Sequence, residues 1–321
     1  MTDQSKILVT GASGFVGSAV IARLKAEAGY LPVAASRAAI AEPGELEQRR
    51  HDLENPSVLP TLDDIGVIVH AAARVHVMRE SATDSLAEFR RVNVDGTVSL
   101  ARAAALAGVR RFIFISSIKV NGEQTADGCR FGADDVPAPQ DPYAISKYEA
   151  EVKLREIEAQ TGMSVVIIRP PLVYGPGVGA NFKSMMRVLL KGWPLPLGAI
   201  NNCRSLVGID NLVDLIIATL EHPAAAGGTF LVSDGVDLST TQLLRSLAAA
   251  LAVPARLLPV PRPILERAAG LLGKGAIAQR LCGSLVVDMT DTCNALNWTP
   301  PVSQNAGLKA TADDYLAHEH P

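Results

Sequence analysis

Three glycines follow the first apolar segment of the chain at a regular spacing. Residues 7–9 (Ile-Leu-Val) predict a short buried strand, and residues 15–24 predict a helix. Gly11, Gly14 and Gly17 form the motif G-x-x-G-x-x-G between these two elements. Such a turn lets a pyrophosphate approach the backbone N–H groups at the positive end of the helix dipole. The segment therefore predicts the start of a dinucleotide-binding α/β unit, although a turn of this kind can also join strand to helix without any ligand.

Short β-branched runs alternate with alanine-rich stretches through the first half of the chain. The runs that predict buried strands are residues 7–10, 33–36, 67–70, 112–116 and 165–169. Helices are expected at residues 14–28, 87–107 and 142–161. This alternation is typical of an α/β fold with a Rossmann-like, doubly wound parallel sheet and helices on both faces. The ligand should bind beyond the carboxyl ends of the strands.

The composition of the sequence changes after residue 169, where glycine and proline become frequent. We expect an NAD(P)-binding Rossmann domain over residues 1–169, to which residues 205–235 return. A smaller C-terminal substrate-binding lobe would then comprise residues 170–204 and 236–321.

Three later segments are informative about this lobe. A strand at 229–233 should rejoin the sheet, and Ser239 or Thr240 should cap a helix at 242–251. The apolar stretch 264–277 has the look of a membrane-surface helix. It lacks the dense Lys/Arg face of such helices, so we expect it to pack on the lobe.

The composition excludes several classes of protein. Hydrophobic residues make up 48% of the 321 residues and the net charge is −3, which is typical of a globular enzyme. No Lys/Arg-rich stretch predicts a nucleic-acid partner, and no apolar run approaches the roughly 20 residues of a membrane span. The four cysteines lack a C-x-x-C pair and the histidines lack H-E-x-x-H, so free thiols and no metal are expected. Without a signal-peptide pattern, these features predict a cytoplasmic enzyme.

The end of the second predicted strand bears on the choice of cofactor. Ser36 and Arg37 stand where a carboxylate would accept the 2′-hydroxyl of NAD. An arginine there favours a 2′-phosphate, because a guanidinium pairs with phosphate in a forked geometry. We therefore expect NADP(H) to be preferred, with NAD(H) as the second choice. The alternative is that Arg37 is a solvated loop residue.

A candidate acid–base pair lies at the start of a predicted helix. Asp141 can cap this helix and Pro142 suits its first turn, which places Tyr143 and Lys147 on one face. A free phenol has a pKa of about 10, and a neighbouring ammonium group, a helix N-terminus and an oxidised nicotinamide all stabilise the phenolate. Tyr143 could then exchange a proton with a hydroxyl group while hydride moves. Ser117, beyond the fourth strand, could orient the same oxygen.

In these motifs and their order, the chain resembles the extended short-chain dehydrogenases/reductases, the NAD-dependent epimerase/dehydratase family, which act on nucleotide sugars. The motifs that carry the resemblance are Thr10–Gly17, His70–Ala73, Asn93–Thr97, Phe114–Ser117, Tyr143–Lys147 and Arg169–Gly177.

The resemblance implies a set of site residues. Catalysis would use Ser117, Tyr143 and Lys147. Cofactor contacts would come from Gly11, Ser13, Gly14, Phe15, Val16, Gly17, Ser36, Arg37, Asp52, Leu53, Ala71, Ala72, Ala73, Asn93, Tyr143, Lys147, Pro170 and Leu172. Substrate contacts would come from Lys119, Asn181 and Arg204, the last two at the diphosphate of a UDP-sugar.

Two departures from the family pattern narrow the reaction. Sugar 4,6-dehydratases carry Asp-Glu after the catalytic Ser/Thr, and Ile118 and Lys119 stand there instead, which disfavours dehydration. The usual V-Y-G is Val120-Asn121-Gly122, so the details of the pocket are open. The stretch 116–123 is similar to bacterial polysaccharide-cluster enzymes that resemble UDP-glucose 4-epimerases. Some of these reduce a UDP-4-keto-6-deoxy-N-acetylhexosamine.

The sequence thus predicts an enzyme that acts at the 4-position of a UDP-linked sugar. We favour 4-keto reduction in surface polysaccharide (O-antigen) biosynthesis, because a reductase must exchange its cofactor and Arg37 favours NADP. The alternative is a UDP-glucose or UDP-N-acetylglucosamine 4-epimerase, which uses the same Ser-Tyr-Lys machinery. A non-catalytic NADP(H) sensor is a distant alternative, since such a protein should lose Tyr143 or Lys147. A homodimer is left open.

Overall fold

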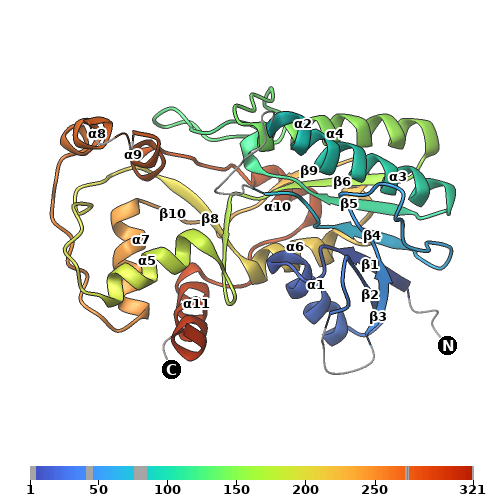
Figure 1. The fold of residues 1–321 in the computed structure, drawn as a ribbon, viewed down its shortest axis with the longest axis horizontal. Coiled ribbons are helices and arrows are strands. Elements are labelled where there is room, and N and C mark those ends of the chain that lie inside the picture. Colours follow the sequence, from blue (N-terminus) through green and yellow to red (C-terminus); the bar gives the residue numbers. More distant parts are fainter. Residues whose placement is uncertain (1–4, 41–45, 76–84, 272, 274, 320–321) are drawn as a thin grey trace.

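A seven-stranded parallel sheet forms the larger part of the protein (Figure 1). The computed structural model describes residues 5–40, 46–75, 85–271, 273 and 275–319. The strand order is β3-β2-β1-β4-β5-β6-β9, which is doubly wound about β1 and β4. The strands are β1 (Ser5–Thr10), β2 (Tyr30–Ser36), β3 (Glu47–Arg50), β4 (Val67–His70), β5 (Arg111–Ile115), β6 (Ser164–Arg169) and β9 (Thr229–Leu231). The expected Rossmann-like α/β fold is confirmed.

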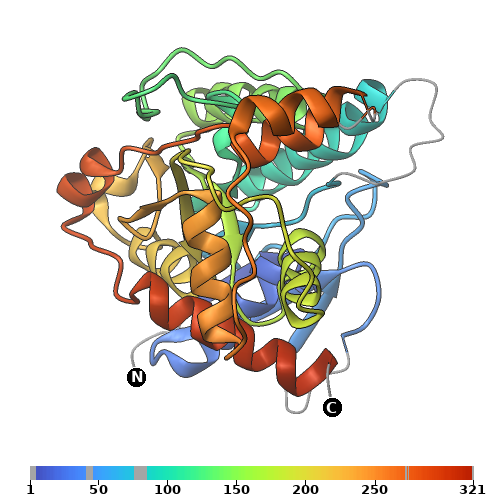
Figure 2. The same cartoon turned by 90° about the vertical axis from the view of Figure 1, so that its left-hand side faces the viewer.

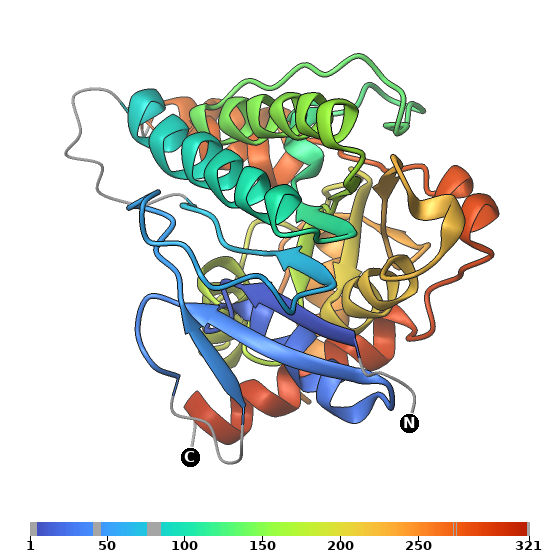
Figure 3. The same cartoon turned by 90° about the vertical axis from the view of Figure 1, so that its right-hand side faces the viewer.

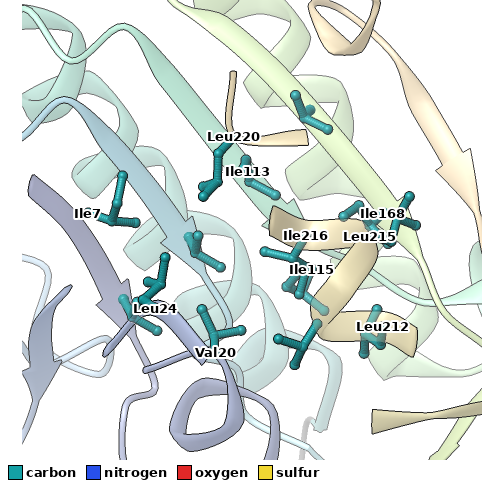
Figure 4. Packing of buried hydrophobic residues seen from close by; sticks show 14 of the residues in the cluster. Ile7, Val20, Leu24, Ile113, Ile115, Ile168, Leu212, Leu215, Ile216 and Leu220 are labelled. Carbon is teal, nitrogen blue, oxygen red and sulfur yellow. The ribbon is translucent and has the colours of Figure 1, made fainter. Parts of the chain in front are cut away.

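Helices cover both faces of this sheet. On one face lie α1 (Phe15–Ala26) and α6 (Ile209–Thr219), whose apolar side chains meet those of β1, β5 and β6 (Figure 4). On the other face lie α3 (Gly96–Leu106) and α4 (Pro142–Thr161), which run side by side (Figure 3). The short helix α2 (Ser85–Phe89) and the π-helix η1 (Arg90–Asp95) precede α3.

The position of the strands follows from their apolar pattern. In β1 and β4 consecutive residues are buried, because helices cover both sheet faces. The strand expected at 229–233 pairs with β6 in parallel as β9, so this segment rejoins the large sheet. The edge strand β3 was not expected, since its sequence Glu-Gln-Arg-Arg is polar and largely exposed.

A second group of elements forms the C-terminal lobe, seen from its outer side in Figure 2. Its small sheet has the order β10-β8-β7. Its strands and helices are β7 (Leu172–Tyr174), α5 (Ala180–Leu190), β8 (Arg204–Gly208), β10 (Asp237–Leu238), α7 (Thr240–Ala250), α8 (Arg262–Leu271), α9 (Gly275–Cys282) and α11 (Gln304–Glu319). Helix α10 (Thr290–Leu296) instead contacts β9, and its Leu296 packs in the core of the large sheet. Apolar side chains of α5, α7 and α11 form the core of this lobe. Of the two caps considered for α7, Ser239 is the one observed, in a capping box with Gln242.

The expectation for the apolar stretch 264–277 is wrong for its first half. Helix α9 begins within this stretch and buries Ala278 and Cys282, which lie beyond it. Helix α8 contacts α9 but has no buried residue, and Ile264 is 55% exposed. The apolar residues of α8 therefore stay outside the core, which only the neighbouring helix α9 reaches. Among the helices that the structure describes, none has the length and hydropathy needed to cross a membrane.

Candidate active site

The glycine turn at the carboxyl end of β1 has little room for side chains. Gly11 has a φ of +65°, and the Gly14 N–H donates to the Gly11 carbonyl at 2.8 Å. A Cβ atom on Gly17 would lie only 2.2 Å from the Gly11 oxygen. Helix α1 begins at Phe15 after Gly14, which provides no side-chain cap. The first-turn N–H groups thus have no capping side chain, which fits a dinucleotide pyrophosphate in this cradle.

The alanine segment after β4 lies against this turn. A Cβ on Gly11 would meet the Ala72 nitrogen at 2.8 Å, so Ala71–Ala73 run close beside the glycines. The Ala72 N–H donates to Thr10 Oγ1 at 3.2 Å. These contacts bring together two of the predicted cofactor segments at neighbouring strand ends.

His70 holds the same strand ends in place. Its Nδ1 lies 2.7 Å from Thr10 Oγ1 and its Nε2 lies 2.9 Å from Thr97 Oγ1. The ring is fully buried, and burial, with the charge of Lys147 adding to it, lowers the pKa of His70 well below its usual range. A neutral imidazole that hydrogen-bonds to two hydroxyl groups has a structural role, because it links β1 and β4 to α3. Sequence reasoning placed His70 in a family motif but did not find this role.

Asn93 connects the π-helix η1 to helix α4. Its Nδ2 donates to Ser146 Oγ at 3.0 Å, and that hydroxyl donates to the Tyr143 carbonyl at 2.7 Å. Its Oδ1 accepts from the Arg74 N–H at 2.8 Å. The amide is thus bonded within the protein, and its expected contact with the cofactor stays a prediction.

Helix α4, which carries the predicted acid–base pair, begins as its sequence predicts. Asp141 Oδ1 accepts from the Ala144 N–H at 2.7 Å, and Pro142 occupies the first helical position. The helix ends at Gly162, whose φ of 75° forms a left-handed cap. Tyr143 and Lys147 therefore lie one turn apart near the helix N-terminus.

The environment of this pair favours an uncharged state in the absence of a cofactor. Lys147 is 2% exposed, and burial lowers its pKa to about 7, opposed by the charge of Glu151. Burial, together with the charge of Asp141, raises the pKa of Tyr143. The Tyr143 ring meets Phe89 edge-on at 6.1 Å. An added positive charge, such as an oxidised nicotinamide, would stabilise the phenolate at this position.

Ser117 lies at the carboxyl end of β5, next to the end of β6. It caps the 3₁₀ turn η2 (Ile118–Val120), and its Oγ accepts from the Lys119 N–H at 3.3 Å. The Ile118 N–H donates to the Pro170 carbonyl at 3.0 Å. The predicted catalytic serine and the predicted cofactor residue Pro170 are thus adjacent. Leu172, also predicted to contact the cofactor, begins β7 and is 39% exposed.

Lys119 does not offer a free charge to a substrate. Its Nζ lies 2.9 Å from Glu123 Oε1 and 2.5 Å from Asp141 Oδ2. Burial works against its charge, but the two carboxylates outweigh burial and raise the pKa of Lys119. The structure thus shows Lys119 supporting the cap of α4, and substrate contact by Lys119 stays a prediction.

Four predicted cofactor residues, Ser36, Arg37, Asp52 and Leu53, lie at or just beyond the ends of β2 and β3. Ser36 Oγ donates to the Ala38 carbonyl at 2.5 Å. Arg37 is paired with Glu54 at 3.2 Å, and its side chain is 69% exposed. Asp52 Oδ1 accepts from the Glu54 N–H at 3.0 Å, and the Leu53 carbonyl packs where a Cβ on Gly96 would be.

The predicted substrate residues of the lobe are separate from these strand ends. Arg204 is in β8, and its Nη1 donates to the carbonyls of Arg280 at 3.0 Å and Gly283 at 3.1 Å. Burial lowers the pKa of Arg204, opposed by the charge of Glu123. The Asn181 side chain lies outside the described part of the chain. Within the described residues there is no group of three His, Cys, Asp or Glu side chains that could hold a metal.

Comparisons with known proteins agree with this architecture. Residues 7–233 match the NAD dependent epimerase/dehydratase family. The UDP-glucose 4-epimerase of Vibrio cholerae is 48% identical over 314 residues, which cover 97% of this chain and 95% of that protein. The structure of UDP-glucuronic acid 4-epimerase from Bacillus cereus in complex with NAD has a TM-score of 0.77 at 22% identity, covering 98% and 100% of the two chains. RMD from Pseudomonas aeruginosa complexed with NADPH has a TM-score of 0.74 at 22% identity, covering 97% and 99%.

Proposed function

Because the chain belongs to the NAD-dependent epimerase/dehydratase family, we propose that it is a UDP-sugar 4-epimerase. The observation that carries this proposal is the 48% identity to a UDP-glucose 4-epimerase over nearly the whole of both chains. The Tyr143–Lys147 pair on α4 and Ser117 at the adjoining strand end supply the acid–base groups such a reaction needs.

This proposal reverses the order in which the sequence ranked two functions. The sequence favoured 4-keto reduction of a UDP-4-keto-6-deoxy-N-acetylhexosamine in O-antigen biosynthesis, on the strength of Arg37. The similarity to a 4-epimerase supports the alternative better and lends the reductase no specific support. A UDP-sugar as the substrate is common to both. Cytoplasmic location and homodimer formation stay predictions.

The chemistry follows from three side chains. When bound, the nicotinamide supplies an acceptor and donor for the C4 hydride of the sugar. Tyr143 takes the proton of the 4-hydroxyl as the hydride leaves and returns it when the hydride comes back to the other face. Lys147 stabilises the phenolate with its positive charge, and Ser117 orients the sugar oxygen. There is no net oxidation, so one cofactor molecule serves many turnovers.

The residues after Ser117 argue against water elimination. The side chain of Ile118 is buried and apolar, and Lys119 is bound by Asp141 and Glu123. Neither can act as the acid that a dehydratase of this family places there. A non-catalytic sensor is also disfavoured, because both Tyr143 and Lys147 are present and stand one turn apart.

The choice between NAD and NADP belongs to the proposal as well. Among the similar solved structures that name a cofactor, most carry NAD and RMD from Pseudomonas aeruginosa carries NADPH. Arg37 is exposed at the end of β2, and its ion-pair partner within the described residues is the exposed Glu54, so Arg37 can turn towards a 2′-phosphate. We therefore keep NADP(H) as the preferred cofactor and NAD(H) as the second choice.

One experiment separates these functions. The purified protein is incubated with UDP-glucose, UDP-N-acetylglucosamine or their 4-epimers without added cofactor, and products are followed by proton NMR. The epimerase should interconvert each active pair to a constant ratio with no lasting change in absorbance at the wavelength of reduced nicotinamide. A parallel incubation contains NADPH and a UDP-4-keto sugar. Stoichiometric NADPH consumption there, with no interconversion in the first incubation, would favour the reductase instead. Cofactor binding without either reaction would favour the sensor.

A further inference from the structure

A buried polar cluster lies one helical turn beyond Lys147, and we call it the Glu151 network. Its members are Ser116, Asn121, Glu151 and Arg169, each at most 5% exposed. Arg169 donates from Nε to Glu151 Oε1 at 3.0 Å and from Nη2 to Oε2 at 2.6 Å. Ser116 Oγ also donates to Glu151 Oε1. Three donors therefore hold both oxygens of this carboxylate.

Asn121 fixes the remaining nitrogen of the guanidinium. Its Oδ1 accepts from Arg169 Nη1 at 3.0 Å, and its Nδ2 donates to the Gly132 carbonyl at 2.8 Å. This asparagine stands where the family pattern has a tyrosine. Both the oxygen and the nitrogen of its amide are thus hydrogen-bonded within the protein. The asparagine that replaces the tyrosine of V-Y-G therefore has a structural role.

The loop that contains Gly132 is itself anchored to the lobe. Residues 121–141 join η2 to α4. The Phe131 N–H donates to the Val286 carbonyl at 2.8 Å, the Asp288 N–H donates to the Phe131 carbonyl at 2.9 Å, and the Thr125 N–H donates to the Ser284 carbonyl at 2.9 Å. The segment 284–288 in turn pairs with β8 through Arg204 and Leu285. Asn121 is therefore held by a loop that is hydrogen-bonded to segment 284–288, outside the Rossmann sheet. This fixed position of Asn121 restricts where the Arg169 side chain can lie.

We propose that Glu151 is a positioning residue that favours the ammonium form of Lys147 against the effect of burial, and that Asn121 holds Glu151 in place through Arg169. The inference rests on the proposed function only in taking Tyr143 and Lys147 as the acid–base pair. Glu151 lies four residues after Lys147 on α4, so the two side chains share one helix face. A carboxylate fixed there favours the ammonium form of a buried lysine.

The charge balance around Lys147 supports this role. On α4 the titratable neighbours are Tyr143 and Glu151, on β4 His70 is neutral, and on β6 Arg169 is bound to Glu151. Most charged groups on the other packed elements have their own partners or are exposed: Glu88 with Arg91, Arg90 with Glu149, Lys119 with Asp141, and Arg102 on the surface of α3. Arg74, after β4, lies 6.0 Å from the centre of the Phe89 ring, and its half-buried side chain carries a positive charge that does not favour the ammonium form of Lys147. Glu151 is thus the carboxylate that opposes the effect of burial on the pKa of Lys147.

The test measures the protonation of Lys147 without requiring turnover. Protein labelled with carbon-13 at lysine is titrated by NMR, and the Lys147 signal is assigned by its loss in Lys147→Met. The wild-type midpoint is expected at about 7. Glu151→Gln should lower it by about one pH unit, and Asn121→Ala should lower it by a smaller amount, because a carboxylate partner shifts a neighbouring pKa by about 1–3 units.

Two further variants keep the test interpretable. Glu151→Gln leaves Arg169 buried and unpaired, so Glu151→Gln/Arg169→Met removes both charges and should still lower the midpoint. Asn211→Ala is the matched control, because Asn211 is 1% exposed and bonds to Asp234 and Val302 away from the network. It should reduce the melting temperature and leave the Lys147 midpoint unchanged.

The outcomes separate this inference from the proposed function. A wild-type midpoint in a folded Glu151 variant, or in folded Asn121→Ala, would overturn the inference and give these residues a purely structural role. Absence of epimerisation by the wild type would overturn the proposed function and leave this titration unaffected.

Discussion

The ammonium nitrogen of Lys147 lies 4.2 Å from the centre of the Phe114 ring. Phe114 is fully buried in β5, so aromatic carbon replaces water on one side of the charge. A cation over an aromatic face regains only part of the hydration that it loses on burial. Lys147 is therefore held in a place where its charge is unfavourable to the folded protein.

The first prediction follows from this placement. In the unfolded chain the pKa of Lys147 is its ordinary 10.5, and in the folded protein burial lowers it to about 7. Between these values the unfolded state binds more protons, so the free energy of unfolding should rise with pH across this window. Lys147→Met should be more stable than the wild type at pH 7, by an amount that shrinks towards pH 10, and should lose catalytic activity. Urea unfolding at a series of pH values measures this, and parallel curves for the two proteins would contradict it.

The second prediction concerns Tyr143. Tyr143→Phe removes the proton-exchanging group, so turnover should fall at least ~100-fold with little change in UDP-sugar affinity. Tyr174 provides a control, since its hydroxyl is buried and donates to Asp234 at 2.7 Å in the lobe. Tyr174→Phe should lower the melting temperature and change turnover much less. Steady-state kinetics with near wild-type turnover in Tyr143→Phe would remove this residue from the mechanism.

The fold was predictable where local patterns decide it. The glycine turn, the strand at 67–70 and the helix at 142–161 appear at the expected residues, because buried runs, a capping aspartate and a following proline act within a few residues. Edge strand β3 was missed because its residues are polar and its position depends on pairing with β2.

The candidate site was only partly predictable for the same reason. The spacing of Tyr143 and Lys147 is a local feature of one helix. The ties Thr10–His70–Thr97 and Asn121–Arg169–Glu151 join residues from separate strands and helices, so no local pattern encodes them. The one available signal for Glu151 was its position four residues after Lys147. Lys119 was expected at the substrate, and its two carboxylate partners could be recognised only from the folded chain.

The third prediction tests the glycine cradle. An alanine at position 17 would place Cβ 2.2 Å from the Gly11 carbonyl oxygen, so the turn must open and lose its fit to a pyrophosphate. Gly17→Ala should weaken cofactor binding at least about tenfold, as measured by calorimetry. Gly270→Ala is the control, because a Cβ there would meet nothing within 4 Å apart from its chain neighbours and its own helix backbone. It should leave cofactor binding unchanged, and equal losses in both variants would refute the cradle.

The fourth prediction concerns Arg204. Arg204→Ala should weaken UDP-sugar binding by about 1.5–3 kcal/mol, typical of a hydrogen bond to a charged group, and leave cofactor affinity unchanged. It should also lower the melting temperature, because the carbonyls of Arg280 and Gly283 lose a donor. Calorimetry with UDP and with the cofactor separates the two effects. A melting-temperature loss with unchanged UDP affinity would show that Arg204 serves the lobe alone.

The last prediction concerns the cofactor and uses Arg37 with its partner Glu54. If Arg37 turns from Glu54 to a 2′-phosphate, the wild type should bind NADPH more tightly than NADH. Arg37→Ala should narrow this difference by about 1–3 kcal/mol, the strength of one charge-assisted contact. Glu54→Gln should widen it, because the carboxylate that competes for Arg37 and repels phosphate is removed. Fluorescence titrations with both nucleotides measure these differences. Equal affinities in all three proteins would assign Arg37 to the solvated loop and leave the proposed epimerase without a preference for NADP.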